Sequence, residues 1–131
     1  MKYMKKIILP IYYEVEYKTK KNKTVLVWLN WYRNVHHFLS NKVKKHYHEL
    51  VKDQVKNKKF GKIKCEYKIY IKRKNTDYHN IRSVVEKFFL DWLVSNWNII
   101  DDSFDYMKWD KCEVFIDKEN PRMEILITNI K

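Results

Sequence analysis

Residues 62–73, with the sequence KIKCEYKIYIKR, alternate between two kinds of side chain. Successive side chains of a strand point to opposite faces of a sheet. One face of this segment is apolar, and it carries Ile63, Cys65, Tyr67, Ile69 and Ile71. The other face carries Lys62, Lys64, Glu66, Lys68 and Lys72. The segment therefore predicts a strand with one buried face and one strongly cationic face.

The same patterns predict the elements before and after this strand. Period-two alternation and β-rich runs predict strands over 7–17, 24–30, 109–116 and about 123–127. Helical spacing predicts a helix from Ser40 to about Asn57 and a second from about Asp77 or Asn80 to Trp97. The predicted order is ββαβαββ, with about five strands and two main helices. We expect residues 1–131 to form a single α/β (α+β) domain with a mixed sheet.

The charge of the chain favours a polyanionic partner. The 131 residues include 28 Lys and Arg against 16 Asp and Glu, which gives a net charge of +12. Such an excess favours nucleic acid over an anionic membrane. No apolar run approaches the roughly 18 residues of a membrane-spanning helix, so we expect no membrane partner and a cytoplasmic location. Cys65 and Cys112 stand far apart, and we expect both to be reduced core residues.

Aromatic residues beside cations indicate how a nucleic-acid strand would be bound. Unpaired DNA is bound by stacking bases on aromatic rings while Lys and Arg follow the phosphates. Most rings are expected in the core, but Tyr70 lies on the lysine face of its strand. The predicted contact strip consists of Lys68, Tyr70, Lys72 and Arg73, extended by Trp31, Arg33, Lys44 and Lys45. It favours single-stranded or branched DNA, because a duplex hides the faces of its bases.

Acidic residues at the two ends of the second helix suggest a metal site. Asp77 precedes this helix, and Asp101 and Asp102 follow it. A strand end, a helix start and a following loop can converge at one edge of a sheet, where carboxylates repel one another and a divalent cation relieves the repulsion. Magnesium prefers such oxygen ligands, and its usual task beside nucleic acid is phosphodiester hydrolysis. In the alternative interpretation, Asp77 caps the helix and the other two acids are solvated.

Three short segments resemble the signature of RusA-type Holliday junction resolvases. They are Asp77-Tyr78-His79-Asn80, Asp91-Trp92-Leu93 and Ile99-Ile100-Asp101-Asp102-Ser103, and the likeness extends over residues 24 to 128. The resemblance implies a small homodimer with a mixed sheet and flanking helices that cuts near DNA crossovers with Mg²⁺ or Mn²⁺. It makes Asp77 and Asp102 the metal ligands, with Asp101 next to Asp102.

Two departures from that signature bear on catalysis. His79 stands where the family has a second acid, and a neutral imidazole is a poor ligand for magnesium. Ser83 replaces a lysine, and Lys87, one helical turn further along, would have to take its place. We therefore expect a resolvase-like protein that binds single-stranded or branched DNA in replication or recombination, with no cofactor needed for binding.

Two alternatives to this expectation remain open. The first is an active endonuclease that uses Asp77, Asp101, Asp102 and Lys87 with Mg²⁺ or Mn²⁺. The second is a nucleoprotein that coats a genome, binds duplex as tightly as single strands and forms filaments. The size, charge and Lys-, Asn- and Ile-rich composition also resemble small DNA-binding proteins of AT-rich viruses, including archaeal rod-shaped ones. For a viral protein, the expected location is the cytoplasm of the host.

Overall fold

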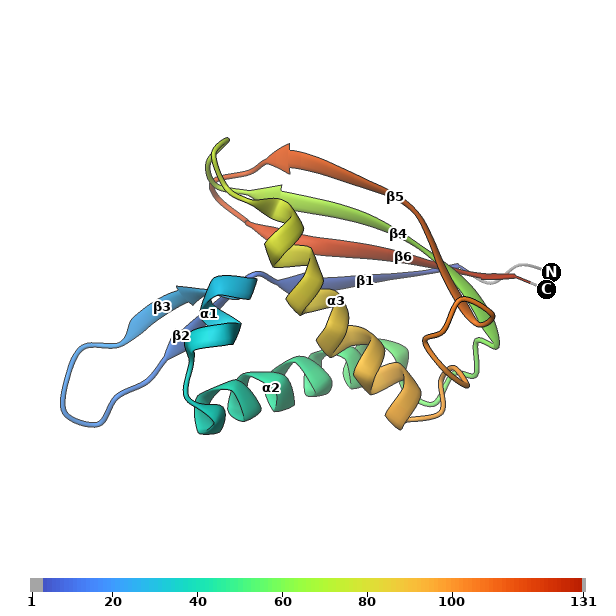
Figure 1. Cartoon of the computed structure of the whole chain (residues 1–131), viewed down its shortest axis with the longest axis horizontal. Helices are drawn as coiled ribbons and strands as arrows, with labels where there is room; N and C mark the ends of the chain where they lie inside the picture. The colour runs from blue at the N-terminus through green and yellow to red at the C-terminus, as the bar shows by residue number, and fades with distance from the viewer. Residues whose placement is uncertain (1–3, 131) are drawn as a thin grey trace.

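A four-stranded mixed sheet forms the centre of the fold in the computed structural model, which describes residues 4–130 (Figure 1). Its order is β1-β6-β4-β5, with β1 over Met4–Pro10, β6 over Arg122–Ile130, β4 over Lys62–Ile71 and β5 over Met107–Ile116. β6 is antiparallel to both β1 and β4, whereas β4 and β5 are parallel. The strands β1, β4 and β5 therefore all run in the same direction.

Three helices lie on one side of this sheet, and the other side is open (Figure 1). They are α1 (Leu29–Asn34), α2 (His37–Val55) and α3 (Tyr78–Ser95). The apolar face of β4 is buried as predicted, since Ile63, Cys65, Tyr67, Ile69 and Ile71 are all at most 3% exposed. The α+β class and the strand over residues 62–71 are thus confirmed.

The predicted strand over residues 7–17 is wrong, because the chain leaves the central sheet at Ile11. β1 ends at Pro10, and a separate hairpin follows, made of β2 (Tyr12–Val15) and β3 (Lys23–Leu26). The break is fixed from both sides: the Val27 amide donates to the Ile11 carbonyl at 2.8 Å, and the buried Tyr47 hydroxyl of α2 donates to the Pro10 carbonyl. The element order is consequently βββααβαββ.

The helix boundaries differ from the predicted ones at their starts. The short helix α1 begins with Leu29 and Asn30, which were predicted to end a strand, and no helix was predicted here. The longer helix α2 starts at His37 rather than at Ser40, because the His36 side chain accepts the Phe38 amide and thereby caps the helix. Ser40 lies inside the helix, where its hydroxyl donates to the His37 carbonyl at 3.0 Å. The start of α3 agrees with the prediction, since Asp77 occupies its N-cap position.

The core lies between the helices and the sheet. From α2 it contains Val43, Tyr47, Val51 and Val55, and from α3 Ile81, Val84, Val85, Phe88, Phe89, Leu90 and Leu93. Both cysteines have free thiols; Cys65 is buried, which raises the pKa of its thiol to about 12, and Cys112 is half-buried. None of the helices between residues 4 and 130 has the length and apolar character needed to cross a membrane.

The strand register defines two edges of the sheet. Arg122 lies opposite both Pro10 and Tyr70, and Tyr70 lies opposite Phe115, so β1, β4 and β5 all end at one edge. We call this edge the carboxyl edge. The hairpin, the β4–α3 turn and the start of α3 all follow from it. At the other edge, the amino edge, Ile63 lies opposite Met107, and the loop between α3 and β5 arrives there.

Candidate nucleic-acid interface

A cleft of about 380 Å³ lies at the carboxyl edge, between the hairpin and the β4–α3 turn. We call it the basic cleft, and its lining residues are Tyr12, Leu26, Trp28, Lys72, Arg73, Asn75, Thr76 and Asp77. The hairpin side supplies two aromatic rings, and the turn supplies two cations, an amide and one carboxylate, that of Asp77. Because the turn lies beyond the last hydrogen-bonded residue of β4, Lys72 and Arg73 are both exposed.

The two sides of the basic cleft are in direct contact. The ammonium Nζ of Lys72 lies 4.4 Å from the centre of the Tyr12 ring, a cation–π contact. This contact brings a positive charge beside an aromatic ring, and it joins the hairpin to the central sheet. Phosphate and base contacts on a single strand need this combination of groups.

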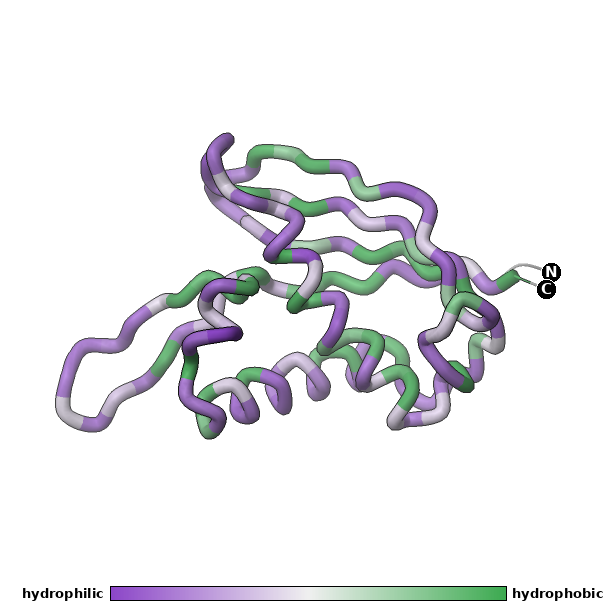
Figure 2. Tube along the Cα trace, in the orientation of Figure 1, coloured by the Kyte–Doolittle hydropathy of each residue, from purple (hydrophilic) through white to green (hydrophobic). Residues whose placement is uncertain are grey.

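The tip of the hairpin, residues 17–23, continues the positive charge away from the body of the protein. It contains Lys18, Lys20, Lys21 and Lys23, all exposed, and no acidic residue. Figure 2 shows the tip as a mainly hydrophilic loop that extends from one end of the molecule. Lys20 Nζ lies 4.3 Å from the centre of the Tyr17 ring, so an aromatic group is present here too. Within residues 4–130, none of these four lysines forms an ion pair with a carboxylate.

A second depression of about 480 Å³ lies between the hairpin and α1. We call it the apolar groove, and it is lined by Val15, Tyr17, Lys23, Thr24, Val25, Leu26, Trp28, Asn30, Trp31, Asn34, Val35 and Leu39. Only one of these residues, Lys23, is charged. Leu26 and Trp28 line both this groove and the basic cleft.

The predicted contact strip does not form one surface. Lys72 and Arg73 lie in the basic cleft, and Trp31 lies in the neighbouring apolar groove. Lys68 and Tyr70 face the open side of the sheet, because alternation along β4 turns them away from the helices. The continuous strip is therefore wrong, and its residues divide among separate surfaces.

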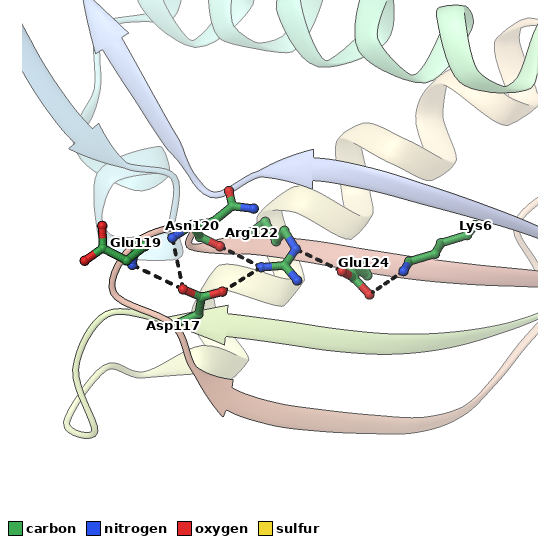
Figure 3. Close-up of polar contacts among 6 residues, drawn as sticks. All are labelled: Lys6, Asp117, Glu119, Asn120, Arg122 and Glu124. Carbon is green, nitrogen blue, oxygen red and sulfur yellow. Dashed lines mark hydrogen bonds and ion pairs between the residues drawn. The ribbon is translucent and has the colours of Figure 1, made fainter.

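The open side of the sheet carries charges of both signs. Arg122 donates to Asp117 at 3.0 Å and to Glu124 at 2.9 Å, and Lys6 lies 3.1 Å from Glu124 (Figure 3). The Arg122 guanidinium also lies 3.8 Å from the centre of the Tyr70 ring. These carboxylates neutralise part of the positive charge, so the face of β4 that was predicted to be strongly cationic lies on a side of the sheet with charges of both signs.

Tyr70 is covered rather than free for stacking. Arg122 lies over its ring, and the Phe115 ring is stacked beside it with centroids 5.2 Å apart. Lys68 borders a pocket of about 200 Å³ that also contains Lys6, Lys111 and three glutamates: Glu66, Glu113 and Glu124. Such a mixed pocket is less suited to a polyanion than the basic cleft.

The remaining predicted cations lie on the helices. Arg33 is exposed on α1, and Lys45 is exposed on α2. Lys44 lies 3.7 Å from Asp91, which belongs to α3. This ion pair connects two helices and leaves Lys44 less available to a phosphate than the hairpin lysines.

The predicted metal ligands lie at different edges of the sheet. Asp77 follows β4 at the carboxyl edge, whereas Asp101 and Asp102 precede β5 and lie toward the amino edge. The intervening helix α3 has 18 residues and is therefore about 27 Å long at 1.5 Å per residue. The expected convergence of the three acids is wrong, because a helical crossover between parallel strands returns the chain to the opposite edge. Within residues 4–130, no group of three or more His, Cys, Asp or Glu residues is arranged to hold a metal ion.

Each predicted catalytic group has a local partner or is exposed. The Asp77 carboxylate accepts a hydrogen bond from the Asn80 side chain at 2.8 Å, and it makes no side-chain cap to the backbone of α3. Lys87 donates to Asp91 at 3.1 Å, one turn along the same helix, and this hydrogen bond raises the pKa of Lys87. Asp101 and Asp102 are exposed, as is His79.

Several residues of the basic cleft were missed by the sequence analysis. Tyr12 and Trp28 were assigned to strands and were not included in the predicted contact strip. The lysines of residues 18–23, between two of the predicted strands, were not included either. A density of four lysines in six residues, with aromatic residues on both sides of the turn, was the available signal.

Comparison of the chain with models of protein families and with curated proteins finds no match to either.

Proposed function

We propose that this protein binds an unpaired nucleic-acid strand along the carboxyl edge, in the basic cleft and over the hairpin tip. The observation that carries the proposal is the placement of Lys72 and Arg73 opposite Tyr12 and Trp28 in one cleft. The cations would neutralise phosphates, and the rings would stack on bases. Neither role requires a metal ion.

The hairpin supports this proposal because it presents charge in an extended form. Its four lysines lie within six residues and have no carboxylate partner within residues 4–130. A flexible strand can follow such a protrusion and still reach the cleft at its base. A rigid duplex exposes its phosphates to lysines but keeps its bases stacked inside, so the cleft aromatics favour unpaired bases.

The distribution of charge also favours this end of the molecule. On the open side of the sheet, Arg122 and Lys6 are held by Asp117 and Glu124. On the helical side, Lys44 and Lys87 share Asp91. A polyanion that contacted these four cations would have to compete with the carboxylates that already hold them.

Fluorescence anisotropy with labelled strands tests the proposal. The probes are a DNA strand of about 12 nucleotides, an RNA strand of the same sequence, the matching duplex and a four-way junction, each at about 100 mM salt. We expect at least one single strand to bind at least about tenfold more tightly than the duplex, and EDTA to have no effect. Equal affinity for duplex and single strand would overturn the proposal in favour of a coat protein. Metal-dependent cutting of the junction would overturn it in favour of a nuclease.

A further inference from the structure

The loop between α3 and β5 exposes several large apolar side chains. The exposed fractions of Trp97, Ile100 and Phe104 are 68%, 57% and 76%. All three side chains lie within one segment of eight residues, 97–104. Exposed apolar residues that occur singly are ordinary, but a concentration of this kind marks an interaction site. The loop makes its own backbone turns, since the Tyr106 and Met107 amides both donate to the Ser103 carbonyl. Its apolar side chains are thus presented outward by a structured segment.

The same loop is acidic in a strongly basic protein. Residues 97–106 contain Asp101, Asp102 and Asp105 and no Lys or Arg, a net charge of −3, whereas the whole chain carries +12. We call this segment the acidic loop. All three aspartates are exposed. The acidic loop would repel nucleic acid, and it suits a partner with a basic, apolar surface.

The apolar groove beside the hairpin has these complementary properties. Its volume of about 480 Å³ is lined mainly by Val, Leu, Tyr and Trp side chains, and its one charged residue is Lys23. Lys18, Lys20 and Lys21 of the hairpin tip follow closely in the chain. The groove is therefore an apolar surface with a positive border, and the acidic loop is an apolar protrusion with a negative border.

The two surfaces cannot meet within one molecule. The hairpin follows the carboxyl edge of the sheet, and the acidic loop precedes the amino edge, so they lie toward opposite ends of the long axis (Figure 1). We propose that the acidic loop of one copy docks into the apolar groove of the next copy. Because the two surfaces differ, this head-to-tail contact is heterologous, and repeated contacts produce an open chain of copies rather than a closed dimer.

This contact goes beyond the proposed function, since it requires no nucleic acid. Its consequence for binding follows from the geometry of the hairpin. The basic cleft and the apolar groove share Leu26 and Trp28, so a copy docked in the groove would lie next to a strand held in the cleft. Because the docked acidic loop would repel that nucleic-acid strand, docking of a neighbouring copy and binding of a strand at the hairpin would weaken each other.

Sedimentation velocity with two complementary variants tests the head-to-tail contact. The loop variant is Asp102→Lys with Phe104→Ser, and the groove variant is Lys23→Glu with Asn34→Glu. All four positions are exposed, so the fold should persist, which circular dichroism checks. At about 50 mM salt, the unmodified protein should form increasingly large species between about 1 and about 200 µM. Each variant alone should stay monomeric, because each lacks one half of the contact.

The mixture of the two variants is the decisive sample. The loop variant keeps its groove and the groove variant keeps its loop, so an equal mixture should form dimers of one copy each and nothing larger. Ile8→Ser, which removes an exposed apolar side chain from the open side of the sheet, should associate like the unmodified protein. An unmodified protein that stays monomeric, association of either variant alone, or a mixture that stays monomeric would each overturn the proposal. Binding of the loop variant to a strand of about eight nucleotides, which one copy can cover, reports on the proposed function separately.

Discussion

The Lys72 ammonium lies 4.4 Å from the centre of the Tyr12 ring, which joins the turn after β4 to the first strand of the hairpin. These residues are 60 positions apart in the chain. They meet because β1 and β4 run in the same direction and end at the same edge of the sheet. The basic cleft is therefore a product of strand topology and not of a local motif.

The cations of the basic cleft should determine the salt dependence of binding. A lysine that neutralises one phosphate of a single strand contributes about 0.7 to the slope of log K against log salt. We predict that Lys72→Gln and Arg73→Gln each flatten this slope by about 0.7, measured by anisotropy titrations over a series of salt concentrations.

Lys68→Gln is the matched control for these two variants. It also removes one positive charge, but from β4 itself, on the side of the sheet where Glu113 and Glu124 lie. Its slope should equal that of the unmodified protein. If Lys68→Gln flattens the slope and Lys72→Gln does not, the nucleic-acid strand binds on the open side of the sheet and its assignment to the basic cleft is wrong.

Trp28 should contribute base stacking, since its side chain lines the basic cleft. A stacked base contributes about 1–3 kcal/mol, so Trp28→Leu should weaken single-strand binding by about 5- to 150-fold. Duplex affinity, which depends mainly on phosphates, should change much less. Phe115→Leu alters an exposed ring on the open side of the sheet and should leave both affinities unchanged. Equal losses for duplex and single strand in Trp28→Leu would contradict a stacking role.

The core residues and the main helices and strands could be predicted from the periodicity of apolar residues in the sequence, because this periodicity reflects which side chains are buried. The alternation in residues 62–71 and the helical spacing in α3 both matched the observed burial. The break at Ile11 was hidden, since Ile11 and Val15 continue the alternation of β1 although the chain has moved to another sheet. The Val27 and Tyr47 hydrogen bonds that fix the break come from distant segments.

The candidate site was only partly predictable for a related reason. Lys72 and Arg73 were identified from charge beside aromatic residues, and both lie in the basic cleft. Their ring partners are supplied by the hairpin, whose position depends on long-range pairing. Asp77 and Asp102 were also expected to converge at one edge of the sheet. The helical crossover from β4 to β5 instead carries them to opposite edges.

Asn98 should be a major contributor to stability, because it is 1% exposed and connects the ends of two helices. Its side-chain amide donates to the Lys58 carbonyl at 2.7 Å and to the Lys56 carbonyl at 3.1 Å, just after α2. Asn98→Ala leaves these acceptors without that donor and should lower the free energy of unfolding by about 1–3 kcal/mol in urea titrations. The exposed Asn57→Ala should cost less than about 0.5 kcal/mol. Equal stability of the two variants would contradict this role.

Glu124 should contribute to stability only at pH values at which its carboxylate is ionised. Burial raises its pKa, but hydrogen bonds from Lys6 and Arg122 outweigh burial and leave the pKa below 4.5. A carboxylate with a lowered pKa stabilises the fold above its unfolded pKa, and this stability is lost as pH falls through the folded pKa. Glu124→Gln should therefore be less stable at about pH 7 and lose less stability between about pH 5 and about pH 2, followed by urea midpoints. If Glu124→Gln lost as much stability on acidification as the unmodified protein does, the assigned contribution of the Glu124 carboxylate would be contradicted.

The most direct test of the account compares two sets of lysines at equal net charge. One variant changes Lys18, Lys20, Lys21 and Lys23 to Gln. The other changes to Gln four lysines that are exposed on α2, in the loop after it and at the start of β4, namely Lys45, Lys52, Lys59 and Lys62. Each variant has a net charge of 12 − 4 = +8. Single-strand affinity should fall by more than about 100-fold in the hairpin variant and by less than about tenfold in the other at about 100 mM salt. Equal losses in the two variants would show that total charge alone governs binding and would contradict an interface at the hairpin.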